Sequence, residues 1–139
     1  MAVEIINRTR NRINRQLITR SVEAVLAFKK IKGDVSIAII GDTAMRRLNK
    51  KFRAKDKPTD ILSFVEKESE SPLPGFIGEL FIDLEQIKRQ SKVFKTGVTW
   101  ELAFITIHGA LHLLGYEDET EPGRIEMELL GNKIIKKVI

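Results

Sequence analysis

The chain has 139 residues, of which 42% are hydrophobic and 31% are charged, with a formal net charge of +5, two histidines and no cysteine. This length and composition fit one globular domain with its own core, and they exclude a disordered chain. No apolar run approaches the length of a membrane span, about 20 residues, and no signal peptide is evident, so we expect a cytoplasmic protein. The lack of cysteine excludes disulfides, thiolate nucleophiles and Cys-based zinc sites.

The charge is divided unequally between the two halves of the chain. Residues 1–60 carry fifteen basic and six acidic side chains, a net charge of +9, whereas residues 61–139 carry nine and thirteen, a net charge of −4. A basic N-terminal half predicts a polyanionic partner on that side. The alternative is a solvated helix surface, which basic runs more often form.

The first half of the chain alternates between expected strands and helices. Residues 3–6 form a short apolar run typical of a strand, and residues 7–30 repeat apolar positions every three or four residues, which predicts a helix. Residues 35–40 (VSIAII) predict a buried strand, and residues 44–52 a short helix.

The middle of the chain is expected to supply two more strands. Residues 53–60 (RAKDKPTD) form a charged loop that leads into a strand at residues 61–65. Residues 66–75 contain two prolines and predict a polar, hairpin-like excursion, and residues 77–83 predict the fourth strand.

The last third of the chain is expected to be helical. Residues 84–94 and 98–114 predict two helices, and the second is hydrophobic on most sides and therefore central. Gly115 ends it, and Pro122 marks the start of a final helix. Without repeats or a second core, residues 1–139 predict one α+β domain with four strands and about five helices.

Both histidines lie in one motif, HGALHLLGYED, which begins at residue 108. On a helix, His108 and His112 project from the same face one turn apart, a spacing that lets two imidazoles bind one metal ion. Gly115 lets the chain turn back, so that Asp118 can reach the same ion. The spacing of ligands at +4 and +10 with glycine at +7 matches the metzincin pattern. Three protein ligands leave an open position, which is typical of a catalytic zinc site.

Two alternatives remain open for this motif. The histidines could be hydrogen-bonded core residues, and a neighbouring carboxylate could replace Asp118 as third ligand, at Glu117, Glu119 or Glu121. Gly109 stands where zincins have the glutamate that acts as general base, which disfavours peptide hydrolysis.

A second motif is rich in cations, and it covers residues 48–64 (LNKKFRAKDKPTDILSF). Taken alone, such a run is usually a solvated loop. Beside a metal site, it predicts a phosphate clamp, because arginine makes bidentate phosphate contacts and lysine adds less directional attraction. Its cations are Lys50, Lys51, Arg53, Lys55 and Lys57.

The two motifs, in this order and about fifty residues apart, resemble the YbeY family of bacterial ribosomal-RNA maturation factors, which are metal-dependent endoribonucleases. The resemblance implies a small mixed sheet packed with helices, with a metzincin-like metal helix. It implies zinc ligation by His108 and His112, and a catalytic role for Arg53 facing the metal cleft. It covers most of the chain, so residues 1–139 are expected to form a single YbeY-like metal-dependent hydrolase domain.

The sequence departs from the family pattern at three places. Asp118 stands where the family usually has a histidine as third ligand, which opens the site to divalent ions other than zinc. Val65 replaces a usual proline, and Gly78-Glu79 replaces a common Gly-Asp pair. Only the first departure touches the expected chemistry.

These inferences predict a single-strand-specific endoribonuclease that acts in ribosomal-RNA maturation and ribosome quality control with one Zn²⁺. Its expected partners are single-stranded or ribosomal RNA and ribosomal subunit or assembly proteins, without membrane or DNA. The general base stays open between metal-bound hydroxide and a carboxylate such as Glu117 or Asp118. The alternative function is a non-catalytic ribosome-assembly factor with a structural metal, and a metallopeptidase is less favoured.

Overall fold

A four-stranded mixed sheet organises the chain, with its strands in the order β1-β2-β4-β3. The computed structural model describes residues 3–66 and 75–139. β2 pairs in parallel with β1 on one side and with β4 on the other, whereas β3 pairs antiparallel with β4 and forms one edge of the sheet. The strands are β1 (Val3–Asn7), β2 (Asp34–Ile40), β3 (Ile61–Val65) and β4 (Phe76–Asp83).

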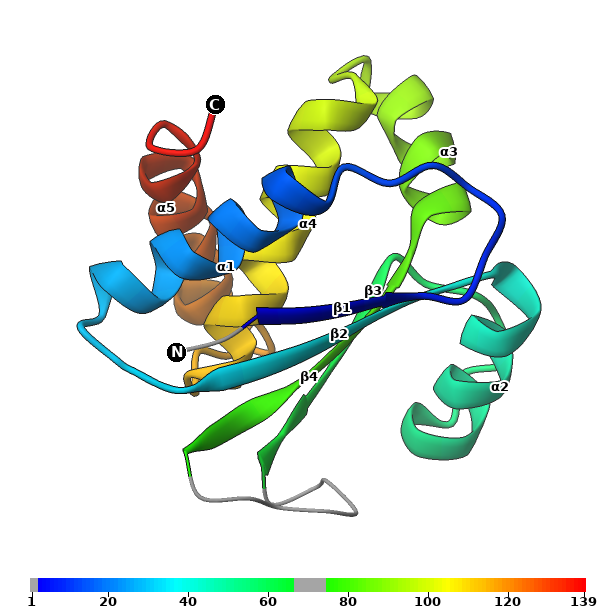
Figure 1. Cartoon of the computed structure of the whole chain (residues 1–139), viewed down its shortest axis with the longest axis horizontal. Helices are drawn as coiled ribbons and strands as arrows, with labels where there is room; N and C mark the ends of the chain where they lie inside the picture. Colours follow the sequence, from blue (N-terminus) through cyan, green and yellow to red (C-terminus); the bar gives the residue numbers. More distant parts are fainter. Residues whose placement is uncertain (1–2, 67–74) are drawn as a thin grey trace.

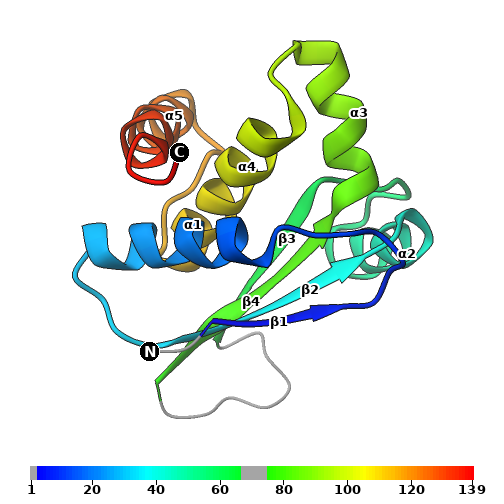
Figure 2. The ribbon, with the colours of Figure 1, turned by 45° about the horizontal axis from the view of Figure 1, so that its top comes forward.

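Helices cover both faces of this sheet. α1, α4 and α5 lie on one face and α2 lies on the other, while α3 leaves the end of β4 and leads to α4 (Figures 1 and 2). The predicted α+β class, with a four-stranded mixed sheet and five helices, is confirmed. The helices are α1 (Arg15–Phe28), α2 (Asp42–Arg53), α3 (Leu84–Phe94), α4 (Val98–Leu113) and α5 (Glu121–Ile135).

Helix α4 is the centre of the larger helical layer, as its hydrophobic sides predict. It contacts α1, α3 and α5 as well as strands β3 and β4. The main core therefore lies between α4, its neighbouring helices and one face of the sheet. Its largest fully buried side chains include Ile18, Leu26, Ile37, Leu80, Ile107, Leu111 and Ile134. A smaller cluster under α2 fills the opposite face, with Ala38, Ile40, Met45, Leu62 and Phe64.

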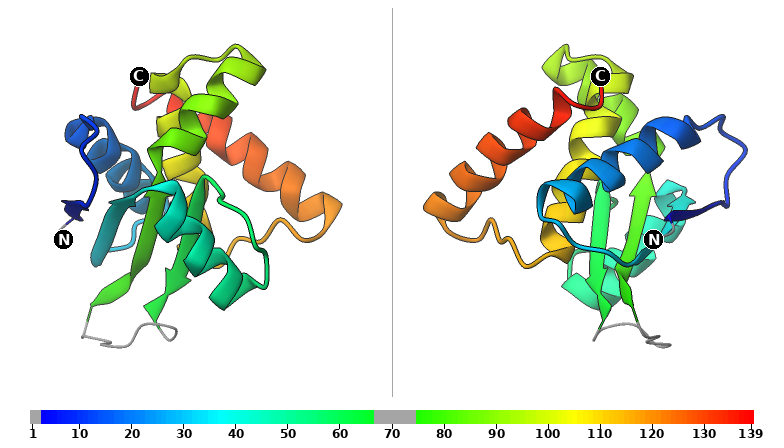
Figure 3. Two further views of the ribbon diagram at one scale, coloured as in Figure 1. Left: turned by 90° about the vertical axis from the view of Figure 1, so that its right-hand side faces the viewer. Right: turned by 60° about the vertical axis from the view of Figure 1, so that its left-hand side comes forward.

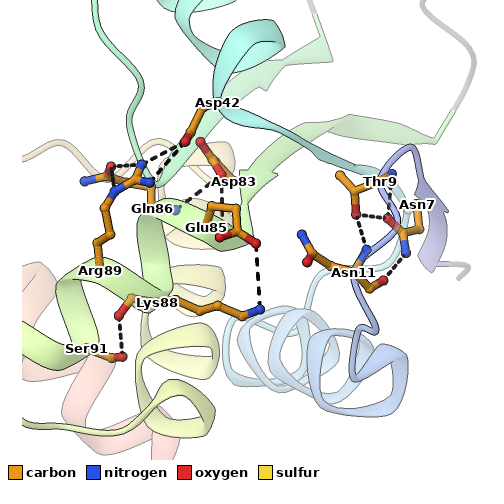
Figure 4. Close-up of polar contacts among 10 residues, drawn as sticks. All are labelled: Asn7, Thr9, Asn11, Asp42, Asp83, Glu85, Gln86, Lys88, Arg89 and Ser91. Carbon is orange, nitrogen blue, oxygen red and sulfur yellow. Dashed lines mark hydrogen bonds and ion pairs between the residues drawn. The ribbon is translucent and has the colours of Figure 1, made fainter.

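The prediction of one helix over residues 7–30 is wrong at its beginning, because α1 starts only at Arg15. The carboxamide oxygen of Asn7 accepts hydrogen bonds from the backbone N–H of Thr9 at 2.9 Å and from its hydroxyl at 2.7 Å (Figure 4). Such local side-chain bonds offer the backbone an alternative to helix. The side chain of Asn14 then caps the first turn of α1.

The other predicted elements agree with the structure to within two residues at each end. The predicted excursion at residues 66–75 lies mostly outside the described residues. In the portions of the chain that the structure describes, none of the helices combines the length and apolar character needed to cross a membrane.

Candidate metal centre

Three donor atoms converge at the C-terminal end of α4. The Nε2 atom of His108 lies 3.2 Å from Nε2 of His112 and 3.1 Å from Oδ2 of Asp118. The third side of this triangle, from His112 Nε2 to Asp118 Oδ2, measures 3.5 Å. In a tetrahedral zinc site with bonds of about 2.0–2.1 Å, ligand atoms lie about 3.3 Å apart. The three donors therefore have the separation of three corners of such a site.

The turn after α4 brings Asp118 to the histidines. Gly115 has a φ of +98°, a conformation that glycine adopts without the strain of a side chain. The N–H of Tyr116 then bonds back to the carbonyl oxygen of Leu111 at 3.2 Å. This closing turn directs the next residues towards the last turn of the helix, as the glycine in the motif predicts.

The same turn orients one of the rings. His112 Nδ1 lies 2.9 Å from the carbonyl oxygen of Tyr116, and because a carbonyl only accepts, Nδ1 carries the hydrogen. A neutral His112 therefore has its lone pair on Nε2, the atom inside the donor triangle. Such a hydrogen bond to the far nitrogen is the usual way in which a metal-binding histidine is oriented.

The charge states of the other two residues suit coordination. Burial lowers the pKa of His108, and the neighbouring His112 lowers it further, so the neutral ring is favoured. Burial by itself would raise the pKa of Asp118, but the charge of His112 and the hydrogen bond with His108 outweigh it and hold that pKa below its usual range. At neutral pH the group offers a neutral imidazole and an ionised carboxylate.

This geometry weighs against the alternative that both histidines are ordinary core residues. Their side chains retain 26% and 27% exposure, and that of Asp118 retains 40%. When Nε2 of His112 is unprotonated, it and the ionised Asp118 carboxylate direct lone pairs to the same point, where a cation can bind both. Among the described residues, His108, His112 and Asp118 form the group that could hold a metal ion, whereas Glu117, Glu119 and Glu121 lie outside it.

Gly109 faces the sheet rather than the metal group. A Cβ added there would overlap the side chain of Ile61 and lie 3.2 Å from Cδ2 of Leu80. The position is therefore part of the close contact between α4 and the strands β3 and β4. A glutamate here, as in zincins, would have to enter that packed interface and displace the Ile61 side chain.

Arg53, at the end of α2, contacts the edge strand that lies against α4. Its Nη2–H donates to the carbonyl oxygen of Ser63 at 3.0 Å, and its guanidinium lies over the ring of Phe64, 4.7 Å from the centroid. The Ser63 hydroxyl in turn donates to the carbonyl oxygen of Gly109 at 3.1 Å. β3 thus links Arg53 to the residue that follows His108.

The basic segment consists of the last turns of α2 and the loop that follows it, and its charges are exposed. The buried side chain of Asn49 donates to the carbonyl oxygen of Lys57 at 2.9 Å, which anchors the loop to α2. Asp60 accepts a hydrogen bond from Gln90 at 3.0 Å, and its negative charge also acts on His108. Asn49, Asp60 and Ser63 belong to the motif at residues 48–64, but the sequence predicted no individual role for them, because their partners depend on the fold. The exposed cations are Lys50, Lys51, Arg53, Lys55 and Lys57.

Comparison with known proteins adds independent evidence. Endoribonuclease YbeY of Roseiflexus sp. (strain RS-1) is 35% identical over 118 residues, which cover 79% of this chain and 74% of that protein. Endoribonuclease YbeY of Bacillus pumilus (strain SAFR-032) is 32% identical over 150 aligned residues, covering 97% of this chain and 93% of that protein.

A solved structure has the same fold. The solution structure of TM1509 from Thermotoga maritima superposes with a TM-score of 0.68 at 22% identity, covering 99% of this chain and 89% of that one. The sequence pattern of the family described as Endoribonuclease YbeY matches residues 4–139. The chain therefore belongs to the YbeY endoribonuclease family, as its two motifs predict.

Proposed function

We propose that residues 1–139 form one metal-dependent hydrolase domain that cleaves single-stranded RNA and acts in ribosomal-RNA maturation and ribosome quality control. Family membership supports an activity on RNA. The observation that carries the proposal is the donor triangle of His108, His112 and Asp118 on the helix that β3 links to Arg53. A metal group on α4 and a guanidinium on α2, connected through the edge strand β3, suit the cleavage of a phosphodiester.

One Zn²⁺ is the ion that we propose for this group. Two imidazoles and a carboxylate are competent zinc ligands, and their separation fits a tetrahedral site. The carboxylate is a hard ligand, so another divalent ion can take the place of zinc. Such an ion would supply Lewis-acid stabilisation of the negative charge that develops on the phosphodiester.

The chain itself supplies the groups that hold the RNA. Arg53, oriented by Ser63 and Phe64, is proposed as the catalytic residue that contacts the scissile phosphate. Phe52 is 45% exposed beside it and offers a ring on which an unpaired base can stack, which supports a preference for single strands. Glu117 is an exposed carboxylate next to Asp118 and can accept a proton once Asp118 is a ligand.

The proposed partners follow from the same surface. The basic half of the chain would follow the phosphate backbone of ribosomal RNA, with an affinity that falls as salt rises. We propose ribosomal subunit or assembly proteins as protein partners, no binding of DNA or membrane, and the cytoplasm as the location.

A turnover assay tests this function. Purified protein is analysed for bound metal and then incubated with an excess of single-stranded ribosomal-RNA fragments, with duplex RNA and single-stranded DNA for comparison. Arg53→Ala and His112→Ala are expected to lower kcat by at least about 100-fold, the typical effect of removing a group that stabilises transition-state charge. Arg124→Ala, which removes an exposed arginine from α5, is the matched control and is expected to retain the wild-type rate.

Each contrary outcome has a distinct meaning. Equal cleavage by wild type and both variants would indicate a contaminating nuclease and remove the enzymatic proposal. Metal-loaded protein that binds RNA without cleaving it would support the non-catalytic assembly factor with a structural metal. Wild-type protein that takes up no divalent ion would contradict both.

A further inference from the structure

The N-terminal half of α5 carries apolar side chains that face outward. Ile125 is 48% exposed and Leu129 is 65% exposed, and they stand one helical turn apart. They line a shallow groove of about 720 Å³ together with Glu121, Pro122, Glu126 and Leu130. We call this surface the α5 groove. Figure 3 shows that this end of α5, drawn in orange, projects from the helical layer in both views.

The outward position of these residues follows from how the rest of α5 packs. The helix buries Met127, Ile134 and Ile135 in the main core. At Gly131 it approaches α4 so closely that an added Cβ would lie 3.0 Å from the ring of Phe104. These contacts fix which side of the helix faces the core, so Ile125 and Leu129 face solvent.

The charge around the α5 groove is opposite to that of the chain as a whole. Among the residues that line the groove, Glu121 and Glu126 are acidic and none is basic, although the net charge of the protein is +5. An exposed apolar strip with a polar, charged rim is typical of a protein–protein interface. Here the rim selects for a positively charged partner.

We propose that the α5 groove binds a basic amphipathic segment of another protein. The segment would place apolar side chains at helical spacing against Ile125 and Leu129, and lysine or arginine side chains against Glu121 and Glu126. The acidic rim disfavours RNA at this surface. A second copy of this chain is also disfavoured, because the basic surface that it would offer is α2 with Arg53, which the proposed function requires to be accessible to RNA.

Synthetic peptides of about 14 residues, four helical turns, test the proposal. The first peptide has leucine and lysine at amphipathic helical spacing, the second has the same composition in scrambled order, and the third is amphipathic and acidic. Leu129→Asp is expected to weaken binding of the first peptide at least about tenfold. The matched control is Val93→Asp on α3, which changes a side chain that is 74% exposed and is expected to leave the binding unchanged.

Two further measurements keep the outcome decisive. Because Leu129 is exposed, Leu129→Asp is expected to keep the wild-type Tm and the wild-type rate of RNA cleavage, so a loss of peptide binding would not reflect unfolding. Equal binding of the scrambled peptide, or an equal loss with Val93→Asp, would overturn the proposal. A concentration-dependent dimer in light scattering that Leu129→Asp abolishes would overturn it too, since the groove would then be a contact between copies.

Discussion

The Nδ1–H of His112 donates to the carbonyl oxygen of Tyr116, 2.9 Å away, inside the turn that leads from α4 to Asp118. The same turn therefore places Asp118 beside the histidines and orients the ring of His112. This turn depends on Gly115, whose φ of +98° is in the region that favours glycine. A change in the backbone conformation at Gly115 should consequently change the affinity of the His108, His112 and Asp118 group for a metal ion.

Gly115→Ala is expected to weaken metal binding. The added methyl group meets no atom within 4 Å, so its effect is the strain of a positive φ, about 1–3 kcal/mol. Gly97→Ala is the matched control, because Gly97 has a φ of +84° with equally open surroundings but lies at the other end of α4. Both variants should lose unfolding free energy, measured by urea denaturation. Only Gly115→Ala should need more Zn²⁺ for half-saturation, and an equal change in both would show that the turn has no special role.

A second prediction concerns the third ligand. Asp118→Ala should reduce the affinity for Zn²⁺ by at least about tenfold, because it removes one of three charged or polar donors. Glu119→Ala changes an exposed neighbouring carboxylate and should leave the affinity unchanged. Asp118→His should keep zinc binding, since imidazole is also a zinc ligand. Isothermal titration with the metal compares the four proteins, and a larger loss with Glu119→Ala would move the third ligand to that residue.

A third prediction tests the close approach at Gly109. Gly109→Ala should lower the free energy of unfolding by about 1–3 kcal/mol, the usual range for overpacking, because the new Cβ overlaps the end of the Ile61 side chain. Ile61→Val removes the overlapping Cδ1 atom. The double variant should therefore be more stable than the sum of the two single effects indicates. Additive effects in denaturant unfolding would contradict the steric explanation.

The metal group could be predicted from the sequence because its three residues lie close together along the chain. His108 and His112 are one turn apart on a helix whose period the sequence shows plainly, and Gly115 marks the turn to Asp118. Helical geometry alone then brings the three side chains together.

The surroundings of the group could not be predicted in the same way. Ser63 and Gly109 are 46 residues apart, and their contact depends on the register of β3 and the position of α4 above it. At residues 7–14, where Ile13 is the only apolar residue, short-range bonds made by Asn7 favour a non-helical backbone, so the helical period begins only near Arg15. The structure therefore differs from the prediction for two reasons: contacts between residues that are distant in the sequence, and local side-chain hydrogen bonds that compete with helix formation.

A carboxyl pair at the ends of β2 and β4 leads to the last prediction. Asp83 is fully buried and caps α3, accepting the N–H of Glu85 at 3.1 Å, while its Oδ2 atom lacks a hydrogen-bond partner among the described residues. Asp42 lies beside it and makes a two-point ion pair with Arg89, at 2.8 and 3.0 Å (Figure 4). That pair lowers the pKa of Asp42 to about 2, so Asp42 stays ionised.

Burial raises the pKa of Asp83 to about 7, and the neighbouring Asp42 raises it further, against the N–H donors of α3. Because this folded-state pKa exceeds the ordinary value of 3.8, the protonated form stabilises the fold. That stability is complete below pH 3.8 and is lost as the pH rises through about 7, at most on the order of 4 kcal/mol. Asp83→Asn keeps an oxygen that caps α3 and adds an amide N–H that can donate to Asp42 at every pH. It should therefore stabilise the protein at pH 8 and have little effect at pH 4.

Urea unfolding of wild type and Asp83→Asn from pH 4 to pH 8 measures this difference. Asp56→Asn is the control of opposite sign, because Arg46 holds the pKa of that exposed carboxyl below its usual range. It should cost a little stability at pH 8, since solvent screens an exposed ion pair and leaves it a small contribution. If Asp83→Asn instead destabilises the protein equally at both pH values, the carboxyl is ionised throughout this range and Oδ2 has a donor in solution.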